Sequence, residues 1–145
     1  MSRRRELRRG LAATAPYLLS HHAADERYRC HRLPVAGRTI LVCARCSGIY
    51  PGIALGVLAF RLGVAPGAWF PVVALGPLPA LVDWALTTFT GHRGRNTVRT
   101  ATGGLLGLAY GLAVPWFLTT WQPRLAAVAV GYGTLALVGL RSVSE

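Results

Sequence analysis

Three cysteines ahead of a long apolar region are the residues best suited to metal or thiol chemistry. Cys43 and Cys46 are three residues apart, and twelve residues separate Cys30 from Cys43. The chain has room to turn back between them through Pro34 and Gly37, so the three thiols can face one point. A tetrahedral zinc site takes four such ligands. The spacing therefore predicts a zinc site here.

The fourth zinc ligand would come from a nearby histidine. His31 adjoins Cys30, although neighbouring residues in an extended chain point in opposite directions, and His21 and His22 are the alternatives. Three thiolates and one imidazole around zinc carry a net charge of −1, which Arg32, Arg38 and Arg45 would offset. The expected ligand set is Cys30, His31, Cys43 and Cys46.

The same cysteines permit two other interpretations. A Cys-x-x-Cys pair at a helix N-terminus beside Arg45 favours a reactive thiol, which would make Cys43 and Cys46 the centre of a membrane-embedded thiol–disulfide oxidoreductase. Cys30 would then serve as a resolving thiol. The plainest alternative is that all three are small apolar residues packed beside a membrane.

A second polar group is predicted around Asp83, the one carboxylate inside a predicted membrane span. An ionisable residue within a span marks a paired or functional position. Arg93, Asn96 and Arg99 follow it in the sequence. Asp83 either forms a salt bridge with Arg99 or Arg93, or shares with them a pocket that grips an anionic lipid headgroup or a phosphate. The pocket interpretation implies an enzyme that acts on an anionic lipid.

The composition excludes a disordered chain and an ordinary soluble domain. Hydrophobic residues make up 52% of the 145 residues and charged residues only 14%, against about 25% charged in soluble domains. The net charge is +11, and all 16 basic residues are arginines. Ten of them lie in residues 1–45, which we expect to form a basic N-terminal region that carries the Cys/His motif.

Residues 46–145 are expected to form a transmembrane helical domain. Four stretches approach the roughly 20 apolar residues needed to cross a bilayer, at about 47–62, 68–89, 100–121 and 125–140. The predicted fold is therefore an all-α integral membrane protein with about four transmembrane helices.

Orientation follows from the distribution of arginine between the loops. With the N-terminus in the cytoplasm, fourteen arginines lie on that side and two, Arg61 and Arg124, on the other. We therefore expect a multi-pass protein of the cell (plasma) membrane with both termini in the cytoplasm. Topology and anionic lipid account for the positive charge, so nucleic acid is not an expected partner.

Two glycine repeats predict how the helices pack. Glycines recur every fourth residue in the first and third spans, and such a repeat lets another helix approach closely. Both spans run from inside to outside, so a contact between them is expected, and the same faces could join copies of the chain or another subunit. The two sets are Gly48, Gly52, Gly56 and Gly103, Gly107, Gly111.

The Cys-rich strings also resemble a known family. Cys30-His31-Arg32-Leu33-Pro34 and Cys43-Ala44-Arg45-Cys46-Ser47-Gly48-Ile49-Tyr50 resemble the signature of small prokaryotic membrane proteins grouped as domain of unknown function 2085. The resemblance extends through Asp83 and the Arg93…Asn96…Arg99 segment. It implies a multi-span membrane protein with a Cys/His motif, and it implies no activity.

The leading expectation is thus a membrane protein with a zinc site at its cytoplasmic face, acting as a sensor, adaptor or accessory subunit. The thiol oxidoreductase and the enzyme acting on an anionic lipid are the alternatives.

Overall fold

The computed structural model describes residues 5–7, 10, 20, 22, 24–35 and 38–144. The chain divides into two compact units, Met1–Ala44 and Arg45–Glu145. Four of the ten arginines in residues 1–45 (Arg3, Arg4, Arg8 and Arg9) lie outside the described residues, as do His21 and Gly37.

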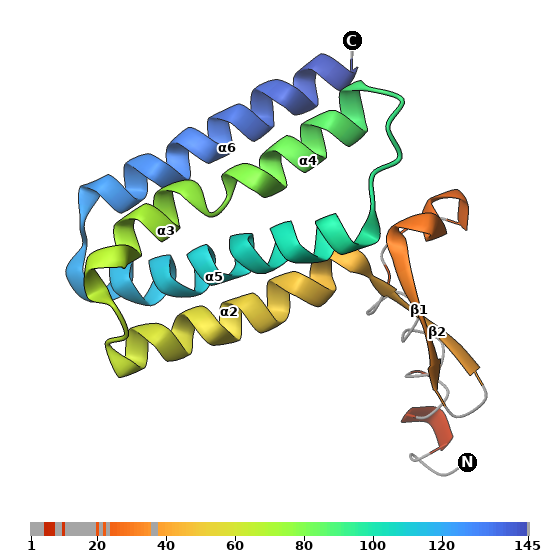
Figure 1. Cartoon of the computed structure of the whole chain (residues 1–145), viewed down its shortest axis with the longest axis horizontal. Helices are drawn as coiled ribbons and strands as arrows, with labels where there is room; N and C mark the ends of the chain where they lie inside the picture. The colour runs from red at the N-terminus through yellow and green to blue at the C-terminus, as the bar shows by residue number, and fades with distance from the viewer. Residues whose placement is uncertain are drawn as a thin grey trace. The chain divides into compact units, whose positions relative to one another are not determined.

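The first unit contains a short 3-10 helix and a β-hairpin (Figure 1). The helix η1 covers Ala24–Arg29, and the antiparallel strands are β1 (Cys30–Val35) and β2 (Arg38–Cys43). Thr39, Ile40 and Val42 in β2 are β-branched residues that favour strands. The all-α expectation omitted this hairpin, because Pro34 and the arginines interrupt the alternation of polar and apolar residues that marks a strand.

The second unit is a bundle of helices in which successive rods run in opposite directions (Figure 1). Its elements are α2 (Ala44–Leu62), which starts one residue before the boundary, η2 (Pro66–Ala68), α3 (Trp69–Leu75), α4 (Leu78–Phe89), α5 (Asn96–Thr120) and α6 (Pro123–Ser144). α3 and α4 together form one rod that is interrupted at Gly76 and Pro77. This agrees with proline lacking the N–H that would continue the helix.

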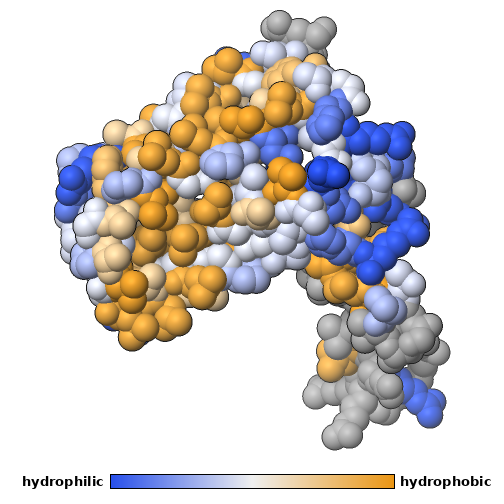
Figure 2. All heavy atoms as spheres, viewed as in Figure 1, coloured by the Kyte–Doolittle hydropathy of each residue, from blue (hydrophilic) through white to orange (hydrophobic). Residues whose placement is uncertain are grey.

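Three described segments are long and apolar enough to cross a membrane: Pro66–Phe89, Asn96–Thr120 and Pro123–Ser142. They correspond to the second, third and fourth predicted spans. α2 has 19 residues but is not among the three, since Arg45 and Arg61 near its ends lower its mean hydropathy. Large apolar side chains such as Leu86, Leu118 and Val130 are exposed on the helices, and Figure 2 shows a broad apolar surface over the bundle.

The predicted contact between the two glycine repeats is confirmed. A Cβ atom added at Gly48, Gly52 or Gly56 of α2 would lie 2.0–2.5 Å from carbonyl oxygens of Thr100, Gly104 or Leu108 in α5. Conversely, a Cβ added at Gly103, Gly107 or Gly111 of α5 would lie 2.2–2.5 Å from carbonyl oxygens of Arg45, Ile49 or Ile53 in α2. The residue numbers of the contacting positions increase in the same direction along both helices, so α2 and α5 are parallel. Their backbones touch at three successive positions spaced four residues apart.

An aromatic cluster lies at the end of the bundle opposite the start of α2. The ring of Trp69 is 5.1 Å from Phe60 and 5.7 Å from Trp116. The guanidinium of Arg124 lies over Phe70 and Trp116, 5.2 and 5.8 Å from the ring centroids. Aromatic rings with an arginine are typical of a membrane–water interface.

Candidate functional site

The hairpin brings Cys30 and Cys43 together. They are the terminal pair of the ladder, directly opposite each other across β1 and β2. Side chains of directly opposed residues project to the same face of a sheet, with Cβ atoms about 4.5–5.5 Å apart. Both are buried, with exposed fractions of 4% and 2%, and neither forms a disulfide. The expectation that the chain returns Cys30 to Cys43 is confirmed.

An imidazole approaches this thiol pair. His22 Nε2 lies 3.3 Å from Cys43 Sγ, and His22 Nδ1 lies 3.2 Å from Glu26 Oε2. When Nδ1 carries the ring proton and donates a hydrogen bond to Glu26, Nε2 presents its lone pair toward Cys43. Ser20 Oγ lies 3.1 Å from Cys30 Sγ and is also buried. In the described part of the first unit, contacts therefore run from the carboxylate of Glu26 through the imidazole of His22 to the thiol of Cys43, which lies opposite the thiol of Cys30.

Glu26 is itself held by an arginine. Arg29 Nη1 lies 3.2 Å from Glu26 Oε1. The hydrogen bond with Tyr28 and the negative charge of Glu26 raise the pKa of Arg29 above its ordinary value. The carboxylate is thus fixed between a cation and the His22 ring.

The two other predicted ligands are His31 and Cys46. His31 pairs with Val42 in the hairpin ladder, and by strand alternation it projects to the face opposite Cys30. Cys46 belongs to the first turn of α2, in the second unit. Within the described residues, no three His, Cys, Asp or Glu side chains are grouped closely enough to hold a metal ion.

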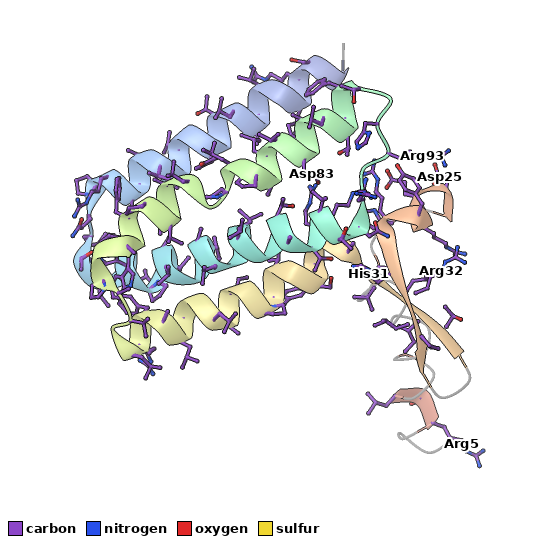
Figure 3. The ribbon with its side chains drawn as sticks, viewed as in Figure 1. Arg5, Asp25, His31, Arg32, Asp83 and Arg93 are labelled. Atoms are coloured by element: carbon purple, nitrogen blue, oxygen red, sulfur yellow. The ribbon has the colours of Figure 1, made fainter. Side chains whose placement is uncertain are left out.

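Asp83 forms an ion pair within the helical bundle. It is 7% exposed, and its Oδ2 accepts a hydrogen bond from Arg45 Nη2 at the start of α2. Figure 3 shows Asp83 on the side of α4 that faces α5. From the sequence, Arg99 or Arg93 was the expected partner of Asp83, and Arg45 was expected beside the Cys motif. The glycine contacts explain the pairing, because they place the first turn of α2 against α5.

Arg99 contacts Asn96 and the backbone of Arg93 near the start of α5. Arg99 is only 4% exposed. Its Nη1 donates to Asn96 Oδ1 at 3.1 Å, and its Nη2 donates to the carbonyl oxygen of Arg93. Gly94 in this loop has φ +67°, a left-handed conformation that favours glycine. Arg99 therefore fastens the loop that joins α4 to α5.

A cavity of about 540 Å³ lies beside Arg45, and it was not predicted from the sequence. It is bounded by α3, α4, α5 and α6, and Arg45 contributes to its lining. Its wall is almost entirely apolar, and five alanines contribute to it. Short side chains that recur on facing helices were the signal that could have revealed it. They are Ala80, Ala109, Ala113, Ala129 and Ala136.

The paired hairpin cysteines and the Asp83 ion pair both lie in a segment that matches a known family. A family described as a predicted membrane protein, domain of unknown function 2085 (DUF2085), matches residues 27–113. The chain belongs to this family. The DUF2085 segment includes the hairpin and α2 to most of α5, and therefore Cys30, Cys43, Asp83 and Arg99, while His22 and α6 lie outside it.

One relative is an uncharacterized protein of Methanocaldococcus jannaschii. It is 29% identical over 89 residues, which are 54% of this chain and 56% of the relative. The chain thus spans just over half the length of the curated relative that it matches. No solved structure matches this DUF2085 chain.

Proposed function

We propose that this membrane protein binds zinc through its hairpin unit and acts as a metal-dependent sensor, adaptor or accessory subunit. The observation that carries the proposal is the opposed pair Cys30 and Cys43, with the imidazole of His22 3.3 Å from the second thiol. Thiolates and imidazoles are the ligands that structural zinc prefers.

Glu26 supports a metal role for His22. A histidine that binds a metal commonly donates its other ring N–H to a carboxylate, which fixes the ring and its tautomer. Glu26 lies in that position, at Nδ1, and Nε2 faces the thiol pair. The spacing of Cys46 from Cys43 supplies a candidate fourth ligand. His22 is thus a stronger candidate than His31, which projects to the other face of the hairpin.

The hairpin has a structural need for a metal. Among the described residues of the first unit, the buried apolar ones are Cys30, Cys43 and Ala44. So few cannot supply much hydrophobic stabilisation, at about 1.5–3 kcal/mol for each large side chain fully buried. Zinc binding to a site that is absent in the unfolded chain adds its binding free energy to folding. The metal would therefore hold the hairpin in shape for contact with a partner.

We further propose four membrane spans, with both termini and the hairpin at the cytoplasmic face of the plasma membrane. α2 is 19 residues long, about 28 Å at 1.5 Å per residue, close to the hydrocarbon thickness of about 30 Å. Its glycine contacts with α5, a helix long enough to span, support a crossing beside it. The fourteen-to-two division of arginines supports the orientation.

Metal analysis of the detergent-purified full chain tests the zinc site. We expect one zinc per chain, lost in Cys30→Ser and in Cys43→Ser. Cys46→Ser tests the fourth ligand. His22→Ala should lose the metal while His31→Ala and His92→Ala keep it. Full occupancy in His22→Ala with loss in His31→Ala would replace His22 by His31 as the ligand. No stoichiometric metal in the unaltered protein would overturn the proposal.

Thiol–disulfide exchange is a second candidate function, favoured by the sequence of contacts from Glu26 through His22 to Cys43. An imidazole oriented by a carboxylate can take the proton of a neighbouring thiol. The Cys43 thiolate would attack a substrate disulfide and release one substrate thiolate. Cys30 would then resolve the mixed disulfide and release the second, so that the hairpin loses two electrons and the substrate gains them. A metal-free protein with a reversible disulfide, located by peptide mapping, would favour this function, whether it joins Cys43 to Cys30 or to Cys46.

Reporter fusions test the topology. Fusions after Gly63 and Gln122 should report the outer side, and fusions after Gly94 and Glu145 the cytoplasm. An outer location at Gly94 would contradict both the span count and the cytoplasmic site.

A further inference from the structure

The cavity of the helical unit combines a long apolar wall with a cation at one end. It follows α6 from Leu125 to Leu140, a length of about 22 Å for fifteen residues at 1.5 Å each. Ligand cavities commonly measure about 300–1,000 Å³, and this one measures about 540 Å³. A long, narrow apolar space of this size suits an extended hydrocarbon chain.

Arg45 lines the cavity with a guanidinium that is held at one edge. Its Nη2 donates to Asp83, its Nε is buried without a hydrogen-bond partner among the described residues, and the side chain is 27% exposed. A buried donor without a partner is costly. Because Asp83 holds one edge of the guanidinium, the exposed part of the side chain keeps a positive charge at this end of the cavity. An anionic oxygen would pair with that charge.

The charge at this end of the bundle favours an anion. Figure 1 shows the start of α2, the end of α4, the start of α5 and the end of α6 at the same end. The described residues of these segments and of the loop between α4 and α5 include five arginines and one carboxylate, that of Asp83. The arginines are Arg45, Arg93, Arg95, Arg99 and Arg141.

We propose that the cavity binds an anionic phospholipid, with one acyl chain along α6 and a phosphate oxygen at the Arg45 guanidinium. The membrane setting of the family supplies this ligand at high local concentration. The site uses none of the hairpin residues, so this proposal is independent of zinc. Asp83 is a positioning residue here, since it orients Arg45 and is not placed to contact the lipid.

Quenching of Trp84 fluorescence tests the site directly, since Trp84 lines the cavity. In a chain with Trp69, Trp116 and Trp121 replaced by Phe, reconstituted phosphatidylglycerol with brominated acyl chains should quench Trp84. Brominated phosphatidylcholine should bind about tenfold more weakly, because it offers the same phosphate oxygens but would place its choline cation beside the charge of Arg45, where like charges repel. Equal quenching by the two lipids would overturn the proposal.

Two kinds of variant separate the headgroup from the chain. The double variant Arg45→Gln/Asp83→Asn removes both charges together and should abolish the preference for phosphatidylglycerol. Ala129→Leu and Ala136→Leu should fill the cavity and reduce quenching by both lipids. The matched control is Ala127→Leu on the same helix, whose side chain is exposed and outside the cavity. Unchanged quenching in both cavity-filling variants would overturn the proposed position of the acyl chain.

Thermal unfolding of the unaltered chain in detergent gives an answer if the single-tryptophan protein does not fold. Added phosphatidylglycerol should raise the unfolding temperature, whereas inorganic phosphate and phosphatidylcholine should not. Equal stabilisation by inorganic phosphate would identify an anion site without a lipid chain and overturn the proposal. A dimeric mass together with no quenching of Trp84 by either brominated lipid would also overturn the proposal, because a second copy of the chain would then cover the cavity.

Discussion

In the hairpin unit the buried apolar residues are largely the site residues themselves, whereas in the helical unit a packed scaffold surrounds the site. Cys30 and Cys43 are both the proposed ligands and most of the buried apolar surface described there. Asp83 and Arg45, in contrast, meet because glycine contacts between α2 and α5 fix the start of α2. The proposed zinc would stabilise the hairpin, whereas in the second unit the packing of the helices positions the ion pair.

This contrast predicts that metal removal acts on one unit only, which is the largest effect we expect. Structural zinc contributes about 10–16 kcal/mol in small zinc-binding domains. A strong chelator should therefore make residues 24–43 sensitive to protease, while the helical circular dichroism of the bundle stays unchanged. Cys30→Ser should reproduce the effect. If the helices melt together with the hairpin, the two units are not independently stabilised.

The glycine contacts predict the next largest effect, within the helical unit. A Cβ at Gly107 would lie 2.2 Å from the carbonyl oxygen of Ile49, so Gly107→Ala must separate α5 from α2. We expect a loss of about 3–5 kcal/mol, in the range of severe core substitutions, measured as thermal unfolding in detergent.

Gly131→Ala is the matched control for this change. A Cβ at Gly131 in α6 meets nothing within 4 Å, so the substitution should be neutral or stabilising by up to about 1 kcal/mol. Equal effects at Gly107 and Gly131 would contradict the packing of α2 on α5. The zinc content should stay the same in both variants.

Loss of the ion pair between Arg45 and Asp83 should reduce stability somewhat less, by an amount that depends on the residue that replaces Asp83. Asp83→Ala removes the ion-pair partner of Arg45, and breaking a buried ion pair lowers the free energy of unfolding by about 3–5 kcal/mol. We expect the lower end of that range, because the Arg45 side chain is 27% exposed. Asp83→Asn keeps an acceptor oxygen and should be milder. Unchanged thermal stability in both variants would mean that the pair contributes nothing to the fold.

The sequence predicted the helical unit better than the hairpin, and the reason is physical. Apolar length and glycine spacing are local patterns, so three of the four predicted spans correspond to helical segments long and apolar enough to cross a membrane, and the contact of α2 with α5 was predicted. The partner of Asp83 depends on how two distant helices meet, so Arg45 was not predicted. The cavity depends on the volume that several helices leave unfilled, which no single segment determines.

Within the Cys motif, spacing predicted that Cys30 returns to Cys43 but not which histidine joins them. Sequence proximity favoured His31, whereas strand alternation directs it away and η1 carries Glu26 toward His22. The side to which a residue projects becomes known only when the strand and its register are known. That register was hidden by Pro34 and the flanking arginines.

The smallest effect should come from Glu26, which contacts the proposed ligand His22 but not the thiols. Glu26→Gln keeps the size of the side chain and an oxygen acceptor while removing its charge, so the hairpin should still fold with metal present. Loss of an outer partner of a metal ligand typically lowers metal affinity 10–100-fold, and competition with a chromogenic chelator would measure this. Asp25→Asn is the matched control, since Asp25 is exposed and adjacent in η1, and it should leave the affinity unchanged. An unchanged affinity in Glu26→Gln together with a slower reaction of Cys43 with a disulfide reagent would instead indicate that Glu26 and His22 serve the thiol, and would shift the hairpin from zinc binding to thiol exchange.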